Sequence, residues 1–129
     1  MNPLFLELDE ILEIHQDQIE RHGGSSGIRD MGLLKSAAAM PAAGFGEQYL
    51  HADIYEMAAA YLFHIVQGHP FVDGNKRTGA MSAFVFLKMN NIQLTASEKS
   101  YEAMVLAAAK GAATKATISD FFRKHTHLK

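Results

Sequence analysis

The sequence predicts an all-α fold, a compact bundle of about six helices around one central buried helix. Three observations lead to this prediction. Apolar residues recur at helical spacing in most segments, no segment is a convincing strand, and glycine or proline closes one segment after another. Since 48% of the 129 residues are apolar, one core can form, and we expect a single domain over residues 1–129.

The first two helices are expected before the proline at position 41. An apolar stripe from Leu8 to Ile19 predicts the first helix, and the glycines of residues 23–27, GGSSG, end it. We expect that glycine segment to be a flexible turn. Asp30 is placed to cap a second, short helix, and Pro41 ends it.

The middle of the chain contains the most apolar helices. Residues 41–53 show no clean period, so we expect a surface loop or a small hairpin there. A stripe from Ile54 to Val66 predicts the third helix. Residues 75–90 are apolar on nearly every side, which is typical of a helix at the centre of a domain.

The last third of the chain predicts two more helices. Thr95 to Glu98 matches a capping box, in which the two side chains satisfy free backbone N–H groups. Thr117 or Ser119 would cap the last helix. The polar tail HTHLK, residues 125–129, is expected to fray.

Composition excludes several classes of protein. The 12 Lys and Arg residues nearly balance the 14 Asp and Glu residues, which disfavours direct binding to nucleic acid or to an anionic membrane. The start, MNPLFLELDEILE, does not read as a signal peptide, and no apolar run approaches the roughly 20 residues that span a membrane. Cysteine is absent. We therefore expect a soluble cytoplasmic protein.

The stretch HPFVDGNKRTGA, residues 69–80, concentrates polar chemistry between two apolar helices. Gly74, Asn75, Lys76 and Arg77 would form the first turn of the second of these helices. Free backbone N–H groups and the helix dipole make a helix start a site for anions. Gly74 would let a ligand approach the backbone, and Asn75 could donate to a phosphate oxygen. Two cations oppose the dipole, which indicates that an anion binds there.

The residues before this turn indicate a reaction as well as binding. Asp73 could cap the helix, or it could hold Mg²⁺ when a polyphosphate is bound. His69 is suited to act as general base for a hydroxyl that attacks phosphorus. Phe71 would be the buried anchor that fixes the shape of the loop. Together these residues predict phosphoryl or nucleotidyl transfer to a hydroxyl.

Each of these residues also has a purely structural interpretation. Asp73 could be a simple cap, Lys76 and Arg77 could be solvated surface charges, and His69 could bind a carbonyl. A non-catalytic module that binds an anion or a partner is therefore an alternative. The co-occurrence of these residues at one helix start favours an active site. His15, on an apolar stripe, is expected to be a core or boundary residue, and no pair of histidines predicts a structural zinc site.

The motif resembles the signature of the Fic/Doc family, and within it the death-on-curing (Doc) branch. The Fic pattern is H-x-F-x-D/E-G-N-G-R-x-x-R, and six positions match it in order: His69, Phe71, Asp73, Gly74, Asn75 and Arg77. The segments 19–34, 58–80 and 86–91 also resemble Doc-like proteins, so the resemblance covers about residues 8–95. It implies a compact all-α fold.

The resemblance also implies roles for the motif residues. His69 would be the catalytic base, and Asp73 would orient Mg²⁺ or assist His69. Four residues would hold the phosphates of ATP: Gly74, Asn75, Lys76 and Arg77.

Two departures from the Fic pattern decide which reaction the resemblance implies. Lys76 replaces the second glycine, and Ala80 replaces the final arginine. In Doc-like proteins a lysine at this position accompanies transfer of the γ-phosphate of ATP, so the resemblance implies a protein kinase. The target that it implies is elongation factor Tu, and the outcome is arrested translation. AMP transfer by a Fic-type adenylyltransferase is the alternative. Gly79, often alanine in Doc-like proteins, is expected to loosen the first turns of its helix slightly.

Control by a separate chain is also expected. The inhibitory motif S/T-x-x-x-E-G/N of many Fic proteins is absent from this sequence. The resemblance therefore implies an antitoxin whose C-terminal segment folds onto the toxin when it binds. Residues 41–53 are the candidate for a flap that holds the target peptide.

Overall fold

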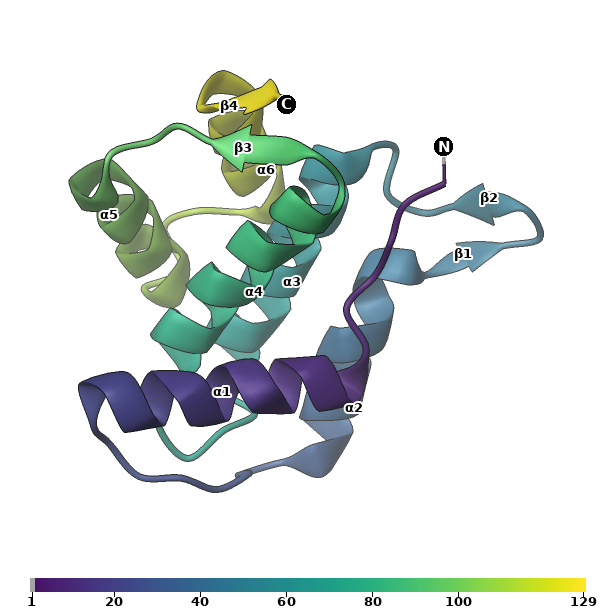
Figure 1. Cartoon of the computed structure of the whole chain (residues 1–129). Coiled ribbons are helices and arrows are strands. Elements are labelled where there is room, and N and C mark those ends of the chain that lie inside the picture. The colour runs from purple at the N-terminus through teal and green to yellow at the C-terminus, as the bar shows by residue number, and fades with distance from the viewer. Residues whose placement is uncertain (1) are drawn as a thin grey trace.

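Six α-helices pack together across residues 2–129, the part of the chain that this computed structural model describes, and they form a compact bundle centred on α3 (Figure 1). In chain order the elements are α1 (Leu8–His22), α2 (Met31–Ala39), the 3₁₀ helix η1 (Met40–Ala42), β1 (Gly44–Phe45), β2 (Gln48–Tyr49), α3 (Ile54–Gly68), α4 (Asn75–Met89), β3 (Ile92–Leu94), α5 (Glu98–Ala109), α6 (Lys115–Lys124) and β4 (Thr126–Leu128). None of the helices in this described range is both long and apolar enough to cross a membrane.

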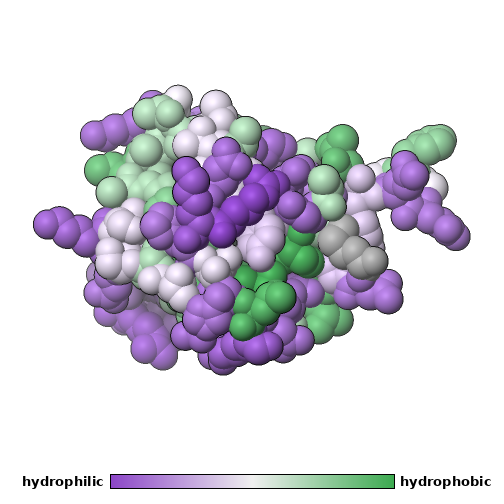
Figure 2. Space-filling model, turned by 90° about the horizontal axis from the view of Figure 1, so that it is seen from above, coloured by the Kyte–Doolittle hydropathy of each residue, from purple (hydrophilic) through white to green (hydrophobic). Residues whose placement is uncertain are grey.

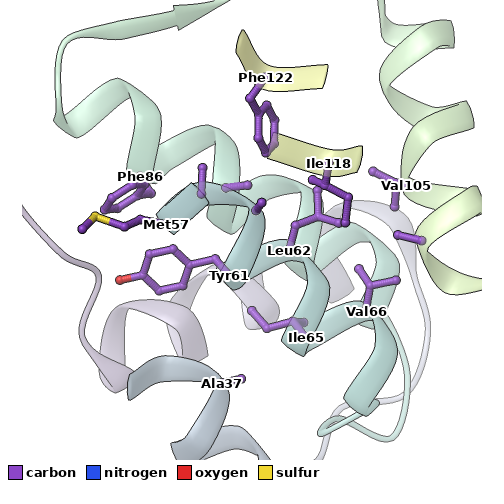
Figure 3. Close-up of a cluster of buried hydrophobic side chains, with 14 of the residues drawn as sticks. Ala37, Met57, Tyr61, Leu62, Ile65, Val66, Phe86, Val105, Ile118 and Phe122 are labelled. Atoms are coloured by element: carbon purple, nitrogen blue, oxygen red, sulfur yellow. The ribbon is translucent and has the colours of Figure 1, made fainter. Parts of the chain in front are cut away.

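The core forms around α3, which contacts α2, α4, α5 and α6. Figure 3 shows how apolar side chains from several helices meet there, and those labelled are Ala37, Met57, Tyr61, Leu62, Ile65, Val66, Phe86, Val105, Ile118 and Phe122. The central helix is therefore α3, and the prediction that residues 75–90 would be central was wrong. One side of α4 is partly exposed to solvent. A groove runs along it, and Met81 and Val85, which line this groove, are only half-buried.

Gly79 has a packing role that the sequence analysis did not predict. A Cβ atom at this position of α4 would lie 2.6 Å from Cγ2 of Val66 and 3.2 Å from the carbonyl oxygen of Leu62, both on α3. The missing side chain lets the two helices approach closely. The expectation that Gly79 loosens the first turns of its helix stays a prediction, and the close packing is a second effect that opposes it.

The helix starts agree with the sequence prediction in the first half of the chain but differ in the second. The Asp30 side chain accepts from the backbone N–H of Leu33, as expected for a cap. For α5 the cap is Ser97, so the predicted capping box from Thr95 to Glu98 does not form. For α6 the cap is Thr114, which replaces the predicted Thr117 or Ser119.

Two small antiparallel sheets complete the fold. The pairing of β1 with β2 confirms a small hairpin within residues 41–53, and this hairpin stands out from the body on the right of Figures 1 and 2. Most of the body in Figure 2 has a hydrophilic surface. The second sheet pairs β3 with β4, with Ile92 opposite Leu128. The predictions of no strand and of a frayed tail were therefore wrong.

Candidate functional site

The loop that carries the motif joins the end of α3 to the start of α4, and residues 69–74 are here called the motif loop. Figure 1 shows this connection at the bottom of the molecule, beside the segment between α1 and α2. His69 begins the loop with φ 50° and ψ 54°, in the left-handed region, and its backbone N–H donates to the carbonyl oxygen of Ile65 at 3.2 Å. This conformation is uncommon for a residue other than glycine, and it ends the helix abruptly. His69 is exposed to solvent.

Phe71 lies at the inner side of the motif loop, with 1% of its surface exposed. Its ring stacks on that of His15, with ring centroids 3.8 Å apart and planes 5° from parallel. The side chain of Asn75 bridges the loop, since its Oδ1 accepts from the backbone N–H of Phe71 and its Nδ2 donates to the Phe71 carbonyl oxygen, each at 3.0 Å. These contacts fix the shape of the loop from within.

The contacts of Asn75 bear on its predicted role. Both ends of its amide are bonded to the backbone of Phe71, and the residue is 8% exposed. Its side chain therefore acts first as a brace of the loop. Binding of phosphate by Asn75 remains a prediction, and its backbone N–H in the first helical turn is better placed for this than its amide group.

Asp73 is an exposed, charged carboxylate held by backbone donors. Its Oδ2 accepts from the N–H of Ser25 at 3.1 Å, and its Oδ1 accepts from the N–H of Gly74 at 2.9 Å. These two bonds, together with the charges of Arg77 and His15, hold the pKa of Asp73 below its usual range. Each oxygen keeps lone pairs free of these bonds, so the carboxylate can still bind a cation.

Gly74 caps the start of α4 with φ 78°, in the left-handed region. A Cβ atom here would lie 3.1 Å from Cδ1 of Ile19 and 3.6 Å from Nε2 of His15. The space that this glycine leaves therefore faces α1. Within residues 2–129 no side chain caps the start of α4, so the backbone N–H groups of its first turn are free to bind an anion.

Lys76 and Arg77 are exposed and line a cleft of about 630 Å³ between α4 and α5. Its floor is largely apolar, and its remaining lining residues are His22, Ala80, Glu98, Lys99, Tyr101, Glu102, Ala103, Val105 and Leu106. The hydroxyl of Tyr101 donates to the carbonyl oxygen of Ala80 at 2.6 Å, which joins the two walls. Neither His69 nor Asp73 lines this cleft, although Arg77 is close enough to help lower the pKa of Asp73.

Residues 24–30, here called the brace segment, run alongside the motif loop. The N–H of Val72 donates to the carbonyl oxygen of Gly27 at 3.1 Å, and Ile28 forms an antiparallel bridge with Phe71. A Cβ atom at Gly24 would lie 2.6 Å from Oδ2 of Asp73. The prediction of a free flexible turn missed these contacts.

His15 is a core residue, one of the two positions predicted for it. It is 4% exposed, and its Nε2 lies 2.8 Å from the carbonyl oxygen of Asp73. Since a carbonyl oxygen only accepts, Nε2 carries the hydrogen. The histidine therefore supports the motif loop by stacking and by hydrogen bonding, a contribution that its position on an apolar stripe did not indicate.

Comparisons with known proteins identify the family of this sequence. The model of the Fic/DOC family matches residues 5–87, a range that includes the whole motif loop. A relative named protein kinase doc, from Escherichia phage P1, is 30% identical over 116 residues, which cover 90% of each chain. A relative named toxin Doc, from Mycolicibacterium smegmatis, is 40% identical over 74 residues, which cover 57% of each chain.

Proposed function

Because this chain belongs to the Fic/Doc family, we propose that it is the toxin of a toxin–antitoxin pair and that it transfers the γ-phosphate of ATP to a hydroxyl of a target protein. The relatives named protein kinase doc and toxin Doc support both parts of this proposal. The target that we propose is elongation factor Tu, so that the reaction would arrest translation.

One observation carries the proposal: the exposed side chains of His69 and Asp73 lie on the short loop that leads directly into the first turn of α4. That turn carries Lys76 and Arg77 and no acidic residue. A base, a cation ligand and an anion site are what transfer of a phosphoryl group to a hydroxyl requires. A site that only binds an anion would need neither His69 nor Asp73.

His69 would act as the general base. The oxygen of the target hydroxyl forms a bond to the γ-phosphorus, the bond from that phosphorus to the β–γ bridging oxygen breaks, and ADP leaves. The hydroxyl proton passes to His69. Lys76, Arg77 and the free N–H groups of the first turn would stabilise the negative charge on the phosphoryl oxygens.

Asp73 is the residue that fits a magnesium ion. Among residues 2–129 no group of three or more His, Cys, Asp or Glu side chains could hold a metal, and Mg²⁺ typically uses one or two carboxylates together with substrate phosphates and water. An ionised, solvent-facing Asp73 meets that need. When bound, the ion would neutralise charge on the phosphates.

The cleft between α4 and α5 supports transfer of the γ-phosphate over transfer of AMP. We propose that the γ-phosphate lies beside His69 and that the chain of phosphates passes Lys76 and Arg77 toward the cleft. The apolar floor at Ala80 and Leu106 would then receive the adenosine. An arginine at position 80 would occupy part of that space.

Two protein partners belong to this proposal. The hairpin of β1 and β2 offers backbone groups at its edges and the exposed side chains of Phe45 and Tyr49. It could hold a segment of the target as an added strand, as the flap predicted for residues 41–53 would. An antitoxin whose C-terminal segment folds on binding would control the activity.

Transfer from ATP labelled separately at the α- and γ-phosphate tests the proposal. Each label is mixed with Mg²⁺, the protein and elongation factor Tu, and the His69→Ala variant is the control. Label on the factor from the γ-position only, lost in the variant, is expected. Label from the α-position would show AMP transfer instead. Label from neither position would contradict the proposed reaction on this target and favour a module that only binds an anion or a partner.

A further inference from the structure

We propose that Arg29 is a positioning residue that holds His69 in the conformation needed for catalysis. This inference rests on the proposed role of His69 as general base. It concerns a side chain outside the motif, on the brace segment.

Arg29 binds the carbonyl oxygens of three successive residues, from the last residue of α3 into the motif loop. Its Nη2 donates to the oxygen of Gly68 at 2.8 Å, its Nε donates to the oxygen of His69, and its backbone N–H donates to the oxygen of Pro70 at 2.8 Å. Within residues 2–129 no other residue donates to the oxygens of Gly68 and His69, whereas the Pro70 oxygen also accepts from the backbone N–H of Asp30 at 3.0 Å. One residue therefore spans the end of the helix and the first two residues of the motif loop.

The location of these oxygens explains why an arginine suits the position. The last carbonyl groups of a helix have no partner within the helix, and the helix dipole gives this end partial negative charge. A guanidinium group supplies positive charge and several N–H donors in a fixed plane, so it can satisfy two oxygens at once. A lysine ammonium would supply the charge without that fixed geometry.

The backbone of His69 explains why this support matters. Within residues 2–129, His69 and Asn91 are the two residues other than glycine with a positive φ. A residue with a side chain adopts this region only when its surroundings hold it there. The backbone conformation sets the direction in which the Cα–Cβ bond of His69 leaves the chain, and the bonds from Arg29 to the carbonyl oxygens of Gly68 and His69 hold that backbone.

Arg29 is not placed to bind the nucleotide in the cleft. It is absent from the residues that line the cleft of Lys76 and Arg77. A positioning role therefore predicts a loss in kcat with little change in the KM for ATP, because the transition state depends on the direction of the base while ground-state binding of ATP does not.

The test measures steady-state transfer of phosphate to elongation factor Tu by Arg29→Ala and Arg29→Lys. We expect kcat to fall by about 100-fold in Arg29→Ala, the loss that a misplacement of about 1 Å produces, while KM for ATP stays within about two-fold of the wild-type value. Added guanidinium, at concentrations well below those that unfold the protein, should restore part of the kcat of Arg29→Ala. Arg29→Lys should retain the fold and still lose activity.

Arg123→Ala is the matched control. Arg123 also makes several bonds around α3, to Asp53, Glu56 and Asp120, but at the opposite end from the motif loop. This variant should lose stability and keep the kcat of the folded enzyme. Unchanged kcat in Arg29→Ala, or a raised KM with unchanged kcat, would overturn the inference, and the second result would make Arg29 a ligand of the nucleotide.

A measurement that needs no activity separates this inference from the proposed function. The Cα and Cβ chemical shifts and the amide–Hα coupling of His69 report its φ angle in solution. They should indicate a positive φ in the wild type and in Arg123→Ala, and a shifted or averaged value in Arg29→Ala. A His69 φ that is unchanged in Arg29→Ala would refute the positioning role even if the wild type transfers no phosphate.

Discussion

Replacement of Gly79 by alanine should destabilise the fold, although alanine is the better helix former. A Cβ atom at position 79 would lie 2.6 Å from Cγ2 of Val66, closer than carbon atoms pack, and 3.2 Å from the carbonyl oxygen of Leu62. Valine has a stiff χ1 angle in a helix, and the carbonyl belongs to the backbone of α3. Neither neighbour can move aside alone, so α3 and α4 would have to separate slightly.

The expected magnitude follows from two opposing effects. Overpacking a tight core contact costs about 1–3 kcal/mol, and replacement of glycine by alanine within a helix recovers about 1 kcal/mol. We therefore expect Gly79→Ala to lower the free energy of unfolding by up to about 2 kcal/mol. Adding Val66→Ala removes the 2.6 Å contact, so Gly79→Ala should cost less in that background.

Urea unfolding followed by circular dichroism measures this change. Gly68→Ala is a matched control, because Gly68 also lies in a helix and the nearest atom to an added Cβ is 4.0 Å away, on Pro70. The control should be neutral or slightly stabilised. A Gly79→Ala variant that is more stable than the wild type by about 1 kcal/mol, the full gain in helix propensity, would refute the packing argument and support the view that this glycine only loosens α4.

Two further predictions concern activity and pH dependence. Gly24→Ala should lower phosphate transfer far more than Gly23→Ala in assays that vary Mg²⁺. Both positions have positive φ, but a Cβ atom at Gly24 would lie 2.6 Å from Oδ2 of Asp73, whereas nothing lies within 4 Å of a Cβ atom at Gly23. Equal losses in the two variants would contradict this prediction. Burial, and next the charge of Lys115, lower the pKa of His64 to about 4. The unfolded chain therefore binds a proton here at higher pH than the folded chain, so stability should be full above pH 6.5, the ordinary pKa of histidine, and fall toward pH 4. Urea unfolding at several pH values should show a smaller fall in His64→Gln, and an equal fall would exclude this histidine as a cause.

The helices of the first half of the chain could be predicted because their apolar stripes are local patterns. The stripe from Ile54 to Val66 coincides with α3, and the cap at Asp30 forms as expected. The choice of central helix depended on more than apolar content. Residues 75–90 are more open than their composition indicated, because the two grooves beside α4 depend on how α1 and α5 pack, and the sequence of α4 does not contain that information.

The features that the sequence did not reveal depend on contacts between distant residues. The pairing of Ile92 with Leu128 turns a polar tail into a strand. The brace segment is also ordered by distant partners, since Gly27 and Ile28 bind the motif loop more than 40 positions later in the chain. Glycines and serines usually indicate flexibility, and only the contacts with the motif loop show that Gly24 and Gly27 lie close against Asp73 and Val72.

The candidate site was predictable in composition but not in arrangement. The residue types of the motif indicated a base, a carboxylate and an anion site, and the structure places His69, Asp73 and the start of α4 on one loop. It places Lys76 and Arg77 along a cleft that His69 does not line. The supporting contacts of His15 and Arg29 come from elements outside the motif, so no pattern within it could indicate them.

The central claim is that the γ-phosphate of ATP, and not the α-phosphate, lies beside His69. The most direct test is a crystal structure of the wild-type protein with Mg²⁺ and an ATP analogue whose β–γ bridge is an imido group. Our account predicts that the γ-phosphorus lies next to His69 and the ion next to Asp73, with the adenosine in the cleft between α4 and α5. An α-phosphorus beside His69, with the adenosine outside that cleft, would contradict the account and indicate a transferase of AMP.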